Sequence, residues 1–491
     1  MKENHLKNIS LKNLNLSENF KNLLNNNLNF EQLIAVKNLN GFFLIIAGAG
    51  SGKTRVIIYR TILLLELQIP SQNILILTFT RKATIEIRNR VSTFLSNSNI
   101  NIETFHSLAY KSLKKYGQNR FFKVLTPEEA IILAKKSNYY RDISDLFSEN
   151  FIERLLLSSK EIFFNKSIFK TLDKKSKFKI KIFLQDFEDI KKRENFCTFD
   201  DLLINFYNLL NLNLIPLTFQ YIMVDEYQDT DKMQVEILKL LSKSGNLMVV
   251  GDDYQSIYNF KGTSMENITN FYRDFPMAKI SILKRNYRST YEILQLANEF
   301  SKSLKYCYYK KLENKNISLK KPTLNIFRDH SQEVLSILNK IKNILKDNPK
   351  DTISILFRNH IYMENFIKIF KSLNMDFYIY PNSFLESLFD ESIFINTHDA
   401  SLTLLTIHGS KGLEWDYVFI PLLLDGVIPT SIGDYIDFEE EKRLFYVALT
   451  RAKKELFLSY PLSFYSDYGF FNTPSIFIES IDSMLINIKR G

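Results

Sequence analysis

The sequence predicts an α/β protein with two domains, each built on a parallel β-sheet covered by helices. Short apolar runs, which are typical of strands buried on both faces, alternate with stretches whose apolar residues recur at helical spacing. Residues 42–65 show the pattern first, as an apolar run, a glycine-rich turn and a helical stretch. The pattern returns in two later series, which two sheets accommodate better than one.

The elements follow in order along the chain. In the first domain, strands are expected at residues 42–46, 73–77, 221–224 and 247–250, with helices from Lys53 to about Leu65 and from Arg81. Between about residues 111 and 195, lysines, aromatics and Leu or Ile recur at helical spacing with almost no glycine, which predicts a helical insertion. Strands of a further series are expected at residues 280–283, 352–357, 402–407, 418–422 and 455–460.

Composition narrows the class of protein. The chain has 491 residues, 45% hydrophobic and 24% charged, which fits a globular protein of two to four domains. Its two cysteines, Cys197 and Cys307, lie outside any CxxC or Cys/His cluster, so we expect a cytoplasmic protein without disulfides or zinc. No signal core or membrane span is expected, because even the apolar run 418–424 is too short. The net charge of +10 fits a polyanionic partner and a biased genome equally well.

The strongest single motif is a phosphate-binding turn. It lies between an expected strand and an expected helix, which is the context that a P-loop needs. Glycines let backbone N–H groups converge on phosphate oxygens, and the helix N-terminus adds positive potential. Lys53 would reach the β- and γ-phosphates and Thr54 would ligate Mg²⁺. The strict pattern begins with Gly where this chain has Ala47. The predicted residues are Ala47, Gly48, Ala49, Gly50, Ser51, Gly52, Lys53 and Thr54.

An acidic pair supplies the second half of such a site. Asp225 and Glu226 follow the expected strand 221–224. Asp225 would hold Mg²⁺ directly or through water, and Glu226 would polarise the attacking water as a general base. Standing alone, the two acids would equally well cap the next helix. Together with the glycine-rich turn, they favour nucleotide hydrolysis.

At residues 224–230 the chain reads VDEYQDT, which closely resembles the VDE[FY]QDT signature of the UvrD/Rep/PcrA helicases of superfamily 1A. The other motifs of that family occur in the same order between Gln32 and Arg451. They are TFTRKA at 78–83, TFHS at 104–107, GDDYQSIY at 251–258, NYRST at 286–290, TIHGSKGLE at 406–414 and YVALTRA at 446–452. Arg81 stands where the family usually has Asn.

The resemblance implies two RecA-like domains of P-loop NTPase type. The expected boundaries are 1–107 with 196–276 for the first domain (1A), 108–195 for its helical insertion (1B) and 277–491 for the second domain (2A). The family's second insertion domain (2B) is expected to be missing or reduced to a loop near 381–402. Tyr380 and Thr406 are only 26 positions apart (406 − 380), whereas a domain needs about 50 residues. The family's C-terminal tail and a nuclease domain are also expected to be absent.

The resemblance also assigns roles around ATP and Mg²⁺. Arg288 and Arg451 would be arginine fingers from the second domain, each worth about 10³ or more in rate. Lys53 and Asp225 lie in the expected first domain, so ATP would occupy the cleft between the two domains. Gln255 would sense the γ-phosphate and link hydrolysis to DNA. The remaining nucleotide contacts would be Gln32 and Tyr287 on adenine, Glu414 on ribose, and Arg55.

Aromatic side chains are the main candidates for nucleic-acid contact, because bases stack on them regardless of sequence at about 1–3 kcal/mol each. By resemblance these are Phe79, Tyr258 and Phe260, with His106 and Arg358 as further contacts. Phe260 and Lys261 stand where well-studied members have Trp and Arg, which weakens stacking and replaces a forked cation by a point charge. The expected partners are single-stranded DNA, its junctions with duplex, and repair or replication proteins, and the expected state is a monomer or weak dimer.

The expected function is therefore an ATP-dependent DNA helicase or translocase moving 3′ to 5′, in repair or replication. Two alternatives stay open: a translocase that strips proteins from single strands with little unwinding, and a degenerate nucleic-acid binder without hydrolysis. The intact catalytic set argues against the degenerate binder. It consists of Lys53, Asp225, Glu226, Gln255, Arg288 and Arg451. No residue distinguishes DNA from RNA, and the resemblance favours DNA. Because the 2B domain is regulatory in the relatives, we expect a minimal motor without autoinhibition, or one that unwinds poorly.

Overall fold

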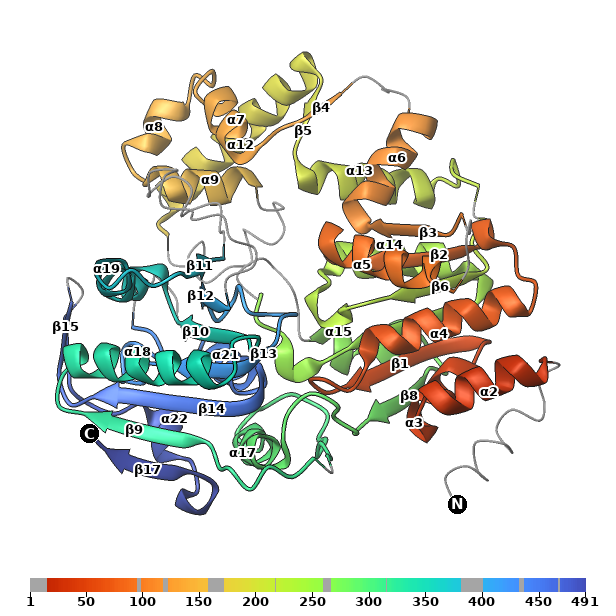
Figure 1. The fold of residues 1–491 in the computed structure, drawn as a ribbon. Coiled ribbons are helices and arrows are strands. Elements are labelled where there is room, and N and C mark those ends of the chain that lie inside the picture. The colour runs from red at the N-terminus through yellow and green to blue at the C-terminus, as the bar shows by residue number, and fades with distance from the viewer. Residues whose placement is uncertain are drawn as a thin grey trace. The chain divides into compact units, whose positions relative to one another are not determined.

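The computed structural model describes residues 16–94, 99–117, 122–157, 172–216, 218–258, 266–314, 316–380, 401–431, 437–466 and 469–491. These residues form two compact units, each built on a parallel β-sheet with helices around it (Figure 1). One unit comprises the chain up to Ile45, Thr54–Val250 and Tyr258–Ile280, and the other comprises Ile46–Lys53, Gly251–Ile257 and Ser281–Gly491. The predicted α/β class with two parallel sheets is confirmed.

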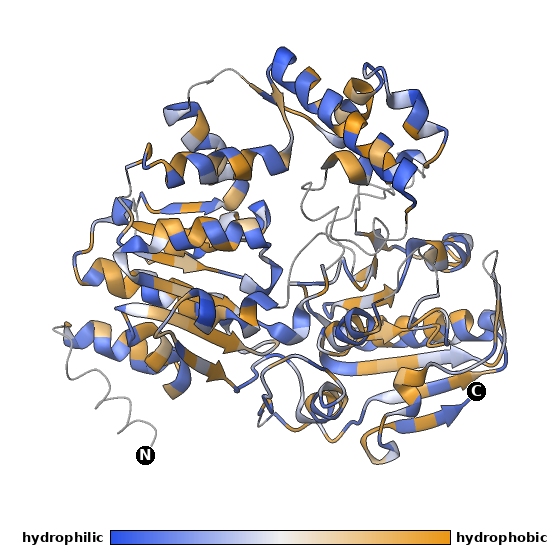
Figure 2. Cartoon of the chain, turned by 180° about the vertical axis from the view of Figure 1, so that it is seen from behind, coloured by the Kyte–Doolittle hydropathy of each residue, from blue (hydrophilic) through white to orange (hydrophobic). Residues whose placement is uncertain are grey.

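The first sheet has six strands in the order β3-β2-β6-β7-β1-β8. They are β1 (Gly41–Ala47), β2 (Ile74–Thr78), β3 (Asn101–Thr104), β6 (Tyr221–Val224), β7 (Asn246–Gly251) and β8 (Lys279–Leu283). β2 runs parallel to β3 and β6, and β6 runs parallel to β7. Every residue of β2 is buried, as expected for a strand with helices on both faces, and the strands are mostly orange in Figure 2.

Helices of this part of the chain begin where side chains can cap them. Thr80 accepts a hydrogen bond from the backbone N of Ala83 and so begins α5, and Asp231 caps α14 through the backbone N of Gln234. The helices are α2 (Glu18–Asn27), α3 (Phe30–Lys37), α4 (Lys53–Glu66), α5 (Arg81–Ser92), α13 (Phe199–Asn211), α14 (Lys232–Leu241), α15 (Glu266–Thr269) and α16 (Phe271–Asp274).

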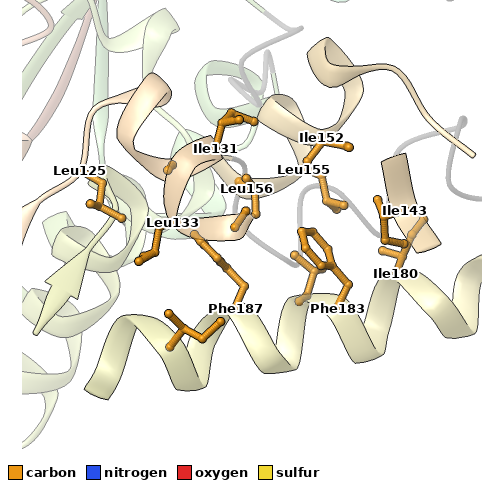
Figure 3. Close-up of a cluster of buried hydrophobic side chains, with 14 residues drawn as sticks. Leu125, Ile131, Leu133, Ile143, Ile152, Leu155, Leu156, Ile180, Phe183 and Phe187 are labelled. Carbon is orange, nitrogen blue, oxygen red and sulfur yellow. The ribbon is translucent and has the colours of Figure 1, made fainter. Parts of the chain in front are cut away.

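A helical segment with its own hydrophobic core interrupts the first sheet. α6 (Phe105–Tyr116), which lies against α13 (Figure 1), leads into this segment. The segment itself contains α7 (Pro127–Ala134), α8 (Tyr140–Ser144), α9 (Glu149–Leu157) and α12 (Lys174–Glu194), with β4 (Lys123–Val124) paired to β5 (Phe196–Cys197). In α12, Phe183 and Phe187 recur at helical spacing and point toward the apolar side chains of α7 and α9 (Figure 3). The predicted insertion is therefore helical, although residues 118–121 and 158–171 lie outside the described part.

The second sheet has seven strands in the order β11-β12-β10-β13-β14-β9-β17, and all six neighbouring pairs are parallel. They are β9 (Thr323–Phe327), β10 (Ile353–Phe357), β11 (Tyr378–Ile379), β12 (Leu402–Thr406), β13 (Trp415–Ile420), β14 (Ala452–Pro461) and β17 (Asn487–Arg490). The helices include α17 (Tyr291–Ser301), α18 (His330–Asp347), α19 (Glu364–Ser372), α21 (Phe438–Leu449) and α22 (Ile476–Glu479), and β15 (Phe464–Ser466) forms a hairpin with β16 (Gly469–Phe471).

The strand at 280–283 was grouped with the second domain, whereas β8 lies in the first sheet beside β1. A lone five-residue strand carries no signal of which sheet it joins, so this grouping was wrong. The loop expected near 381–402 falls on residues 381–400, which lie outside the described part. Of the helices that the structure describes, none has the length and apolar character needed to cross a bilayer.

Candidate active site

A tight turn joins β1 to α4. Both the backbone N and the hydroxyl of Ser51 donate to the carbonyl oxygen of Gly48, at 3.2 and 2.8 Å. Gly50 and Gly52 have φ of +65° and +84°, a conformation that side chains with a Cβ rarely adopt. Lys53 follows as the first residue of α4, so the turn leads directly into a helix N-terminus. A glycine-rich turn that leads into a helix N-terminus is the kind of backbone that can bind an anion.

The same turn packs against the NYRST segment. The Asn286 amide donates to the Ala49 carbonyl oxygen at 2.7 Å, and the Tyr287 backbone N donates to the Gly50 carbonyl oxygen at 2.9 Å. A Cβ at Gly50 would lie 2.6 Å from the Cβ of Arg288, so the lack of space is a second reason, besides the positive φ, why glycine is needed at this position. By these contacts Ile46–Lys53 groups with the second unit. The sequence had placed Lys53 in the first domain because β1 leads into it.

Thr54 and Asp225 form a pair of oxygen donors within the first unit. The Thr54 hydroxyl donates to a carboxylate oxygen of Asp225 at 3.3 Å. Asp225 is 5% exposed, and its backbone N donates to the carbonyl oxygen of Leu77 on the adjoining strand β2. Hydroxyl and carboxylate oxygens are ligands that Mg²⁺ accepts. Mg²⁺ usually keeps several waters and is bound by one or two carboxylates together with phosphate oxygens, which is the kind of ion that such a pair could hold.

Glu226 directly follows and has unusual backbone geometry. Its φ of +53° is in the left-handed region, which is uncommon for a residue with a side chain and recurs at functional sites. Its carboxylate accepts a hydrogen bond from the Gln228 amide at 2.5 Å. The fold therefore holds the side chain of the predicted general base through a neighbour of the same motif.

Gln255 and Arg451 meet in the second unit. Arg451 is 1% exposed and donates to the Gln255 side-chain oxygen at 3.0 Å. Its other nitrogens donate to the carbonyl oxygens of Val447 at 2.9 Å and Leu413 at 3.1 Å. The Lys411 ammonium donates to the Gln255 carbonyl oxygen at 2.7 Å. Three motifs that are far apart in the sequence thus converge on one buried guanidinium.

Arg288 lies against Glu414 in the same unit. Its guanidinium donates to the Glu414 carboxylate at 2.6 Å and to the Thr450 carbonyl oxygen at 3.1 Å. Burial alone would raise the pKa of Glu414, but the charge and hydrogen bond of Arg288 outweigh it and lower that pKa. Glu414 is therefore held as a carboxylate. The two predicted arginine fingers therefore meet at the end of α21: Arg288 donates to the carbonyl oxygen of Thr450, and Arg451 is the next residue in the chain.

The predicted adenosine contacts are placed in different ways. Gln32 is fully buried in α3 and forms a capping box with Asn29, at 2.8 and 3.1 Å. Tyr287 is 45% exposed, and the Arg285 guanidinium lies 5.3 Å from its ring centroid. Arg55 is exposed on α4. Tyr287 is therefore partly exposed beside a guanidinium, whereas Gln32 stabilises the start of its own helix.

Two of the candidate nucleic-acid contacts form an aromatic pair. The rings of Phe79 and Tyr258 are stacked, with centroids 5.7 Å apart and planes at 16°. Phe260 lies outside the described residues. The His106 ring meets the Phe199 ring edge-on at 5.6 Å, and burial lowers the pKa of His106. Burial therefore favours the neutral form of the His106 ring.

Arg358 is engaged within the protein. Its guanidinium forms a bidentate pair with the buried Glu441, with contacts of 2.5–3.0 Å, and also donates to Asn359 at 3.0 Å. The second Glu441 oxygen accepts the backbone N of Thr430. This arrangement stabilises the second unit, and it occupies the groups that a phosphate contact would need.

Sequence reasoning missed the residues that support the motif residues. Asp252 accepts from the Gln255 amide, and its partner Lys310 comes from a segment without any motif. The only sequence signal for Asp252 was its place inside GDDYQSIY, and Lys310 gave none.

Two comparisons identify the class of protein. Residues 28–276, just over half of the chain (249 of 491), match the UvrD/REP helicase N-terminal domain, and residues 281–390 and 382–463 match the UvrD-like helicase C-terminal domain. The chain therefore belongs to the UvrD/REP helicase family.

Among individual relatives, the chain is similar to the ATP-dependent DNA helicase PcrA of Staphylococcus aureus, at 36% identity over 297 residues. PcrA of Staphylococcus epidermidis is 38% identical over 301 residues. Each match covers 57% of this chain and 41% of the relative, so the matched part spans about two fifths of the relatives' length. Among solved structures, the C-terminal domain of a possible DNA helicase from Lactobacillus plantarum aligns over 41% of this chain and 98% of that chain, with 17% identity and a TM-score of 0.29.

Proposed function

We propose that the protein is an ATP-dependent motor on single-stranded DNA, a helicase or translocase that moves 3′ to 5′ in DNA repair or replication. One observation carries the proposal. The segment 251–258 contains Gln255, which contacts Arg451, and Tyr258, which stacks on Phe79. Gln255, the expected γ-phosphate sensor, is therefore only three residues before Tyr258, which belongs to an aromatic pair on which bases could stack. This is the short mechanical connection that a DNA-coupled ATPase requires.

The proposed roles follow from the side chains. Lys53 and the turn before it bind the phosphates, and Arg288 and Arg451 stabilise charge on the transferred phosphoryl group. Thr54 and Asp225 hold Mg²⁺, which when bound neutralises charge on the phosphate oxygens. Glu226 takes the proton of the attacking water. Tyr287 and Gln32 contact the base, Glu414 contacts the ribose, and Arg55 is a further nucleotide contact.

The domain boundaries are part of the proposal. Residues 1–107 with 196–276 would form the 1A domain, 108–195 the 1B insertion and 277–491 the 2A domain, apart from β8 (Lys279–Leu283), which pairs in the first sheet. The contact division after Ile280 and the separate core of α7, α9 and α12 support this arrangement. Single-stranded DNA and its junctions with duplex would be the nucleic-acid partners, and the protein would act in the cytoplasm as a monomer or weak dimer.

A second candidate function is a translocase that removes bound proteins with little unwinding. It is favoured by the short interval between β11 and β12, where the 2B domain of the relatives would be inserted. Only residues 381–400 separate Tyr380 from Ser401. That interval is too short for a further domain, which needs about 50 residues.

The test is ATP hydrolysis with and without single-stranded DNA, by the parent protein and by Glu226→Gln. We expect strong stimulation in the parent and none in the variant, because the amide retains the shape of the carboxylate but cannot take a proton. The variant should still bind ATP. A parent that binds DNA without hydrolysing ATP would overturn the proposal in favour of the degenerate binder.

Two further assays separate the candidate activities. Displacement of streptavidin from a biotin at either end of an oligonucleotide reports direction of travel, and strand displacement on duplexes with a 3′ or a 5′ tail reports unwinding. A 3′-to-5′ translocase frees streptavidin from the 5′ end. If it also opens the 3′-tailed duplex it is a helicase, and if it does not it is the protein-stripping translocase.

A further inference from the structure

Lys310 has a fully buried side chain that lies between two acids. Its ammonium is 2.9 Å from Asp252 and also contacts Asp253, and it lies 3.6 Å from the centroid of the Tyr254 ring. Burying a charge is costly unless it is paired and hydrogen-bonded, and here both acids satisfy the ammonium. Burial favours the neutral amine, but the two carboxylates outweigh it and raise the pKa of Lys310. The ammonium is therefore charged in the folded protein.

The carboxylates of Asp252 and Asp253 each accept hydrogen bonds from Lys310 and from other donors. Asp252 accepts from Lys310, from the Tyr254 backbone N at 3.2 Å and from the Gln255 side-chain amide at 2.5 Å. Asp253 accepts from Lys310 and from the Tyr308 backbone N at 2.5 Å. Burial alone would raise the pKa of Asp252, but the ammonium groups of Lys310 and Lys53 outweigh it and lower that pKa. Asp252 is consequently an acceptor only.

That protonation state sets the orientation of the Gln255 amide. A carboxylate can only accept hydrogen bonds and a guanidinium can only donate them. The Gln255 NH₂ group must therefore face Asp252, and its oxygen must face Arg451, as the distances of 2.5 and 3.0 Å show. A protonated Asp252 could donate to the Gln255 oxygen instead. The amide would then turn its NH₂ group toward the guanidinium, and two donors would meet.

We propose that Lys310 is a positioning residue: its ammonium holds Asp252 as a carboxylate, and that carboxylate orients the Gln255 amide oxygen toward Arg451. The inference rests on the proposed ATP hydrolysis, in which Gln255 and Arg451 contact the γ-phosphate. Lys310 itself lies outside the motifs and acts only through Asp252. The charged and titratable groups that face Asp252 are Lys310, Lys53, Asp253, Tyr254, Tyr446 and, through Gln255, Arg451.

The test compares Lys310→Met with Lys311→Met, a neighbouring lysine that is exposed. Methionine has an unbranched side chain of similar length to that of lysine but carries no charge. In steady-state ATP hydrolysis at saturating DNA near neutral pH, we expect kcat of Lys310→Met to fall about ten- to hundred-fold, with KM for ATP within about two-fold, because misplacing a catalytic group costs about that much. Lys311→Met should match the parent.

A pH profile distinguishes positioning from a general loss of structure. Without the ammonium, burial raises the pKa of Asp252, so the acid is protonated at low pH and ionises as the pH rises. The kcat of Lys310→Met should therefore recover as the pH rises, while the ratio of the parent's kcat to that of Lys311→Met stays constant. A deficit that does not change with pH in a folded variant, or no deficit, would overturn the inference.

A second variant covers the case in which Lys310→Met does not fold. Lys310→Met with Asp253→Asn removes one cation and one anion together, which restores the local charge balance and leaves Asp252 without its ammonium. It should show the same rise of kcat with pH, and a flat profile would count against the proposal. If the parent itself fails to hydrolyse ATP, the proposed function fails, whereas an active parent with an unaffected Lys310→Met overturns this inference alone.

Discussion

Removing the guanidinium of Arg358 should destabilise the second unit. Arg358 and Glu441 form a bidentate pair whose side chains are 15% and 5% exposed, and Glu441 also holds the Thr430 backbone N. In Arg358→Ala the Glu441 carboxylate stays buried without a cation, which costs about 3–5 kcal/mol. For a unit of this size each kcal/mol moves the melting temperature by about 2–4 °C, so a decrease of roughly 6–20 °C is expected.

The assay is thermal unfolding followed by circular dichroism, with single-stranded DNA affinity measured on the same samples. Arg328→Ala is the matched control, because that arginine is 87% exposed and its pair with Asp329 is worth at most about 1 kcal/mol. Arg358→Met with Glu441→Gln should recover most of the lost stability, because it leaves no buried charge and keeps an oxygen that accepts from the Thr430 backbone N. An Arg358→Ala protein with the parent's melting temperature and weakened DNA binding would refute the reasoning and support the nucleic-acid contact expected from the sequence.

Three other outcomes are expected. Phe183→Ala should destabilise the helical segment by about 3–5 kcal/mol in chemical unfolding, whereas Phe178→Ala on the same helix, with a side chain that is 64% exposed, should have little effect. Burial and the neighbouring Asp231 and Asp201 raise the pKa of Asp200 to about 7, above its unfolded value, so the parent loses stability as pH rises from about 4 to about 7. Asp200→Asn should therefore gain stability over the parent at about pH 8 and little at about pH 4, and equal unfolding curves at both would contradict this. Phe79→Ala should weaken single-stranded DNA binding by about 1–3 kcal/mol in fluorescence anisotropy, with Tyr272→Ala, an exposed ring elsewhere in the first unit, unchanged.

The sequence predicted the strands that are buried along their whole length. β2 and β10 are mostly apolar and every residue in them is buried, and their positions agree with the expected strands to within one residue. β9 and β17 were missed because polar residues interrupt β9 and every residue of β17 is exposed, so neither has the apolar signal of a central strand. β8 was recognised as a strand but joined to the wrong sheet, because periodicity describes burial and not pairing.

The candidate site, like the fold, could be predicted from the sequence only in part. Local spacing predicted the turn before Lys53 and the acids after β6, because strand, turn and helix follow one another directly in the chain. The partners could not be predicted. Lys310 meets Asp253 across 57 positions and Arg358 meets Glu441 across 83, and no local pattern relates residues so far apart. The roles assigned to the motif residues remain predictions for the experiments above.

The anchoring of Arg451 has a consequence for how this sequence can diverge. Two of its nitrogens are held by the carbonyl oxygens of Val447 and Leu413. Every residue has a backbone carbonyl oxygen, whatever its side chain. One apolar residue can therefore replace another at these two positions without removing a hydrogen-bond acceptor. The side chains around the arginine can therefore change while its guanidinium keeps the same backbone partners.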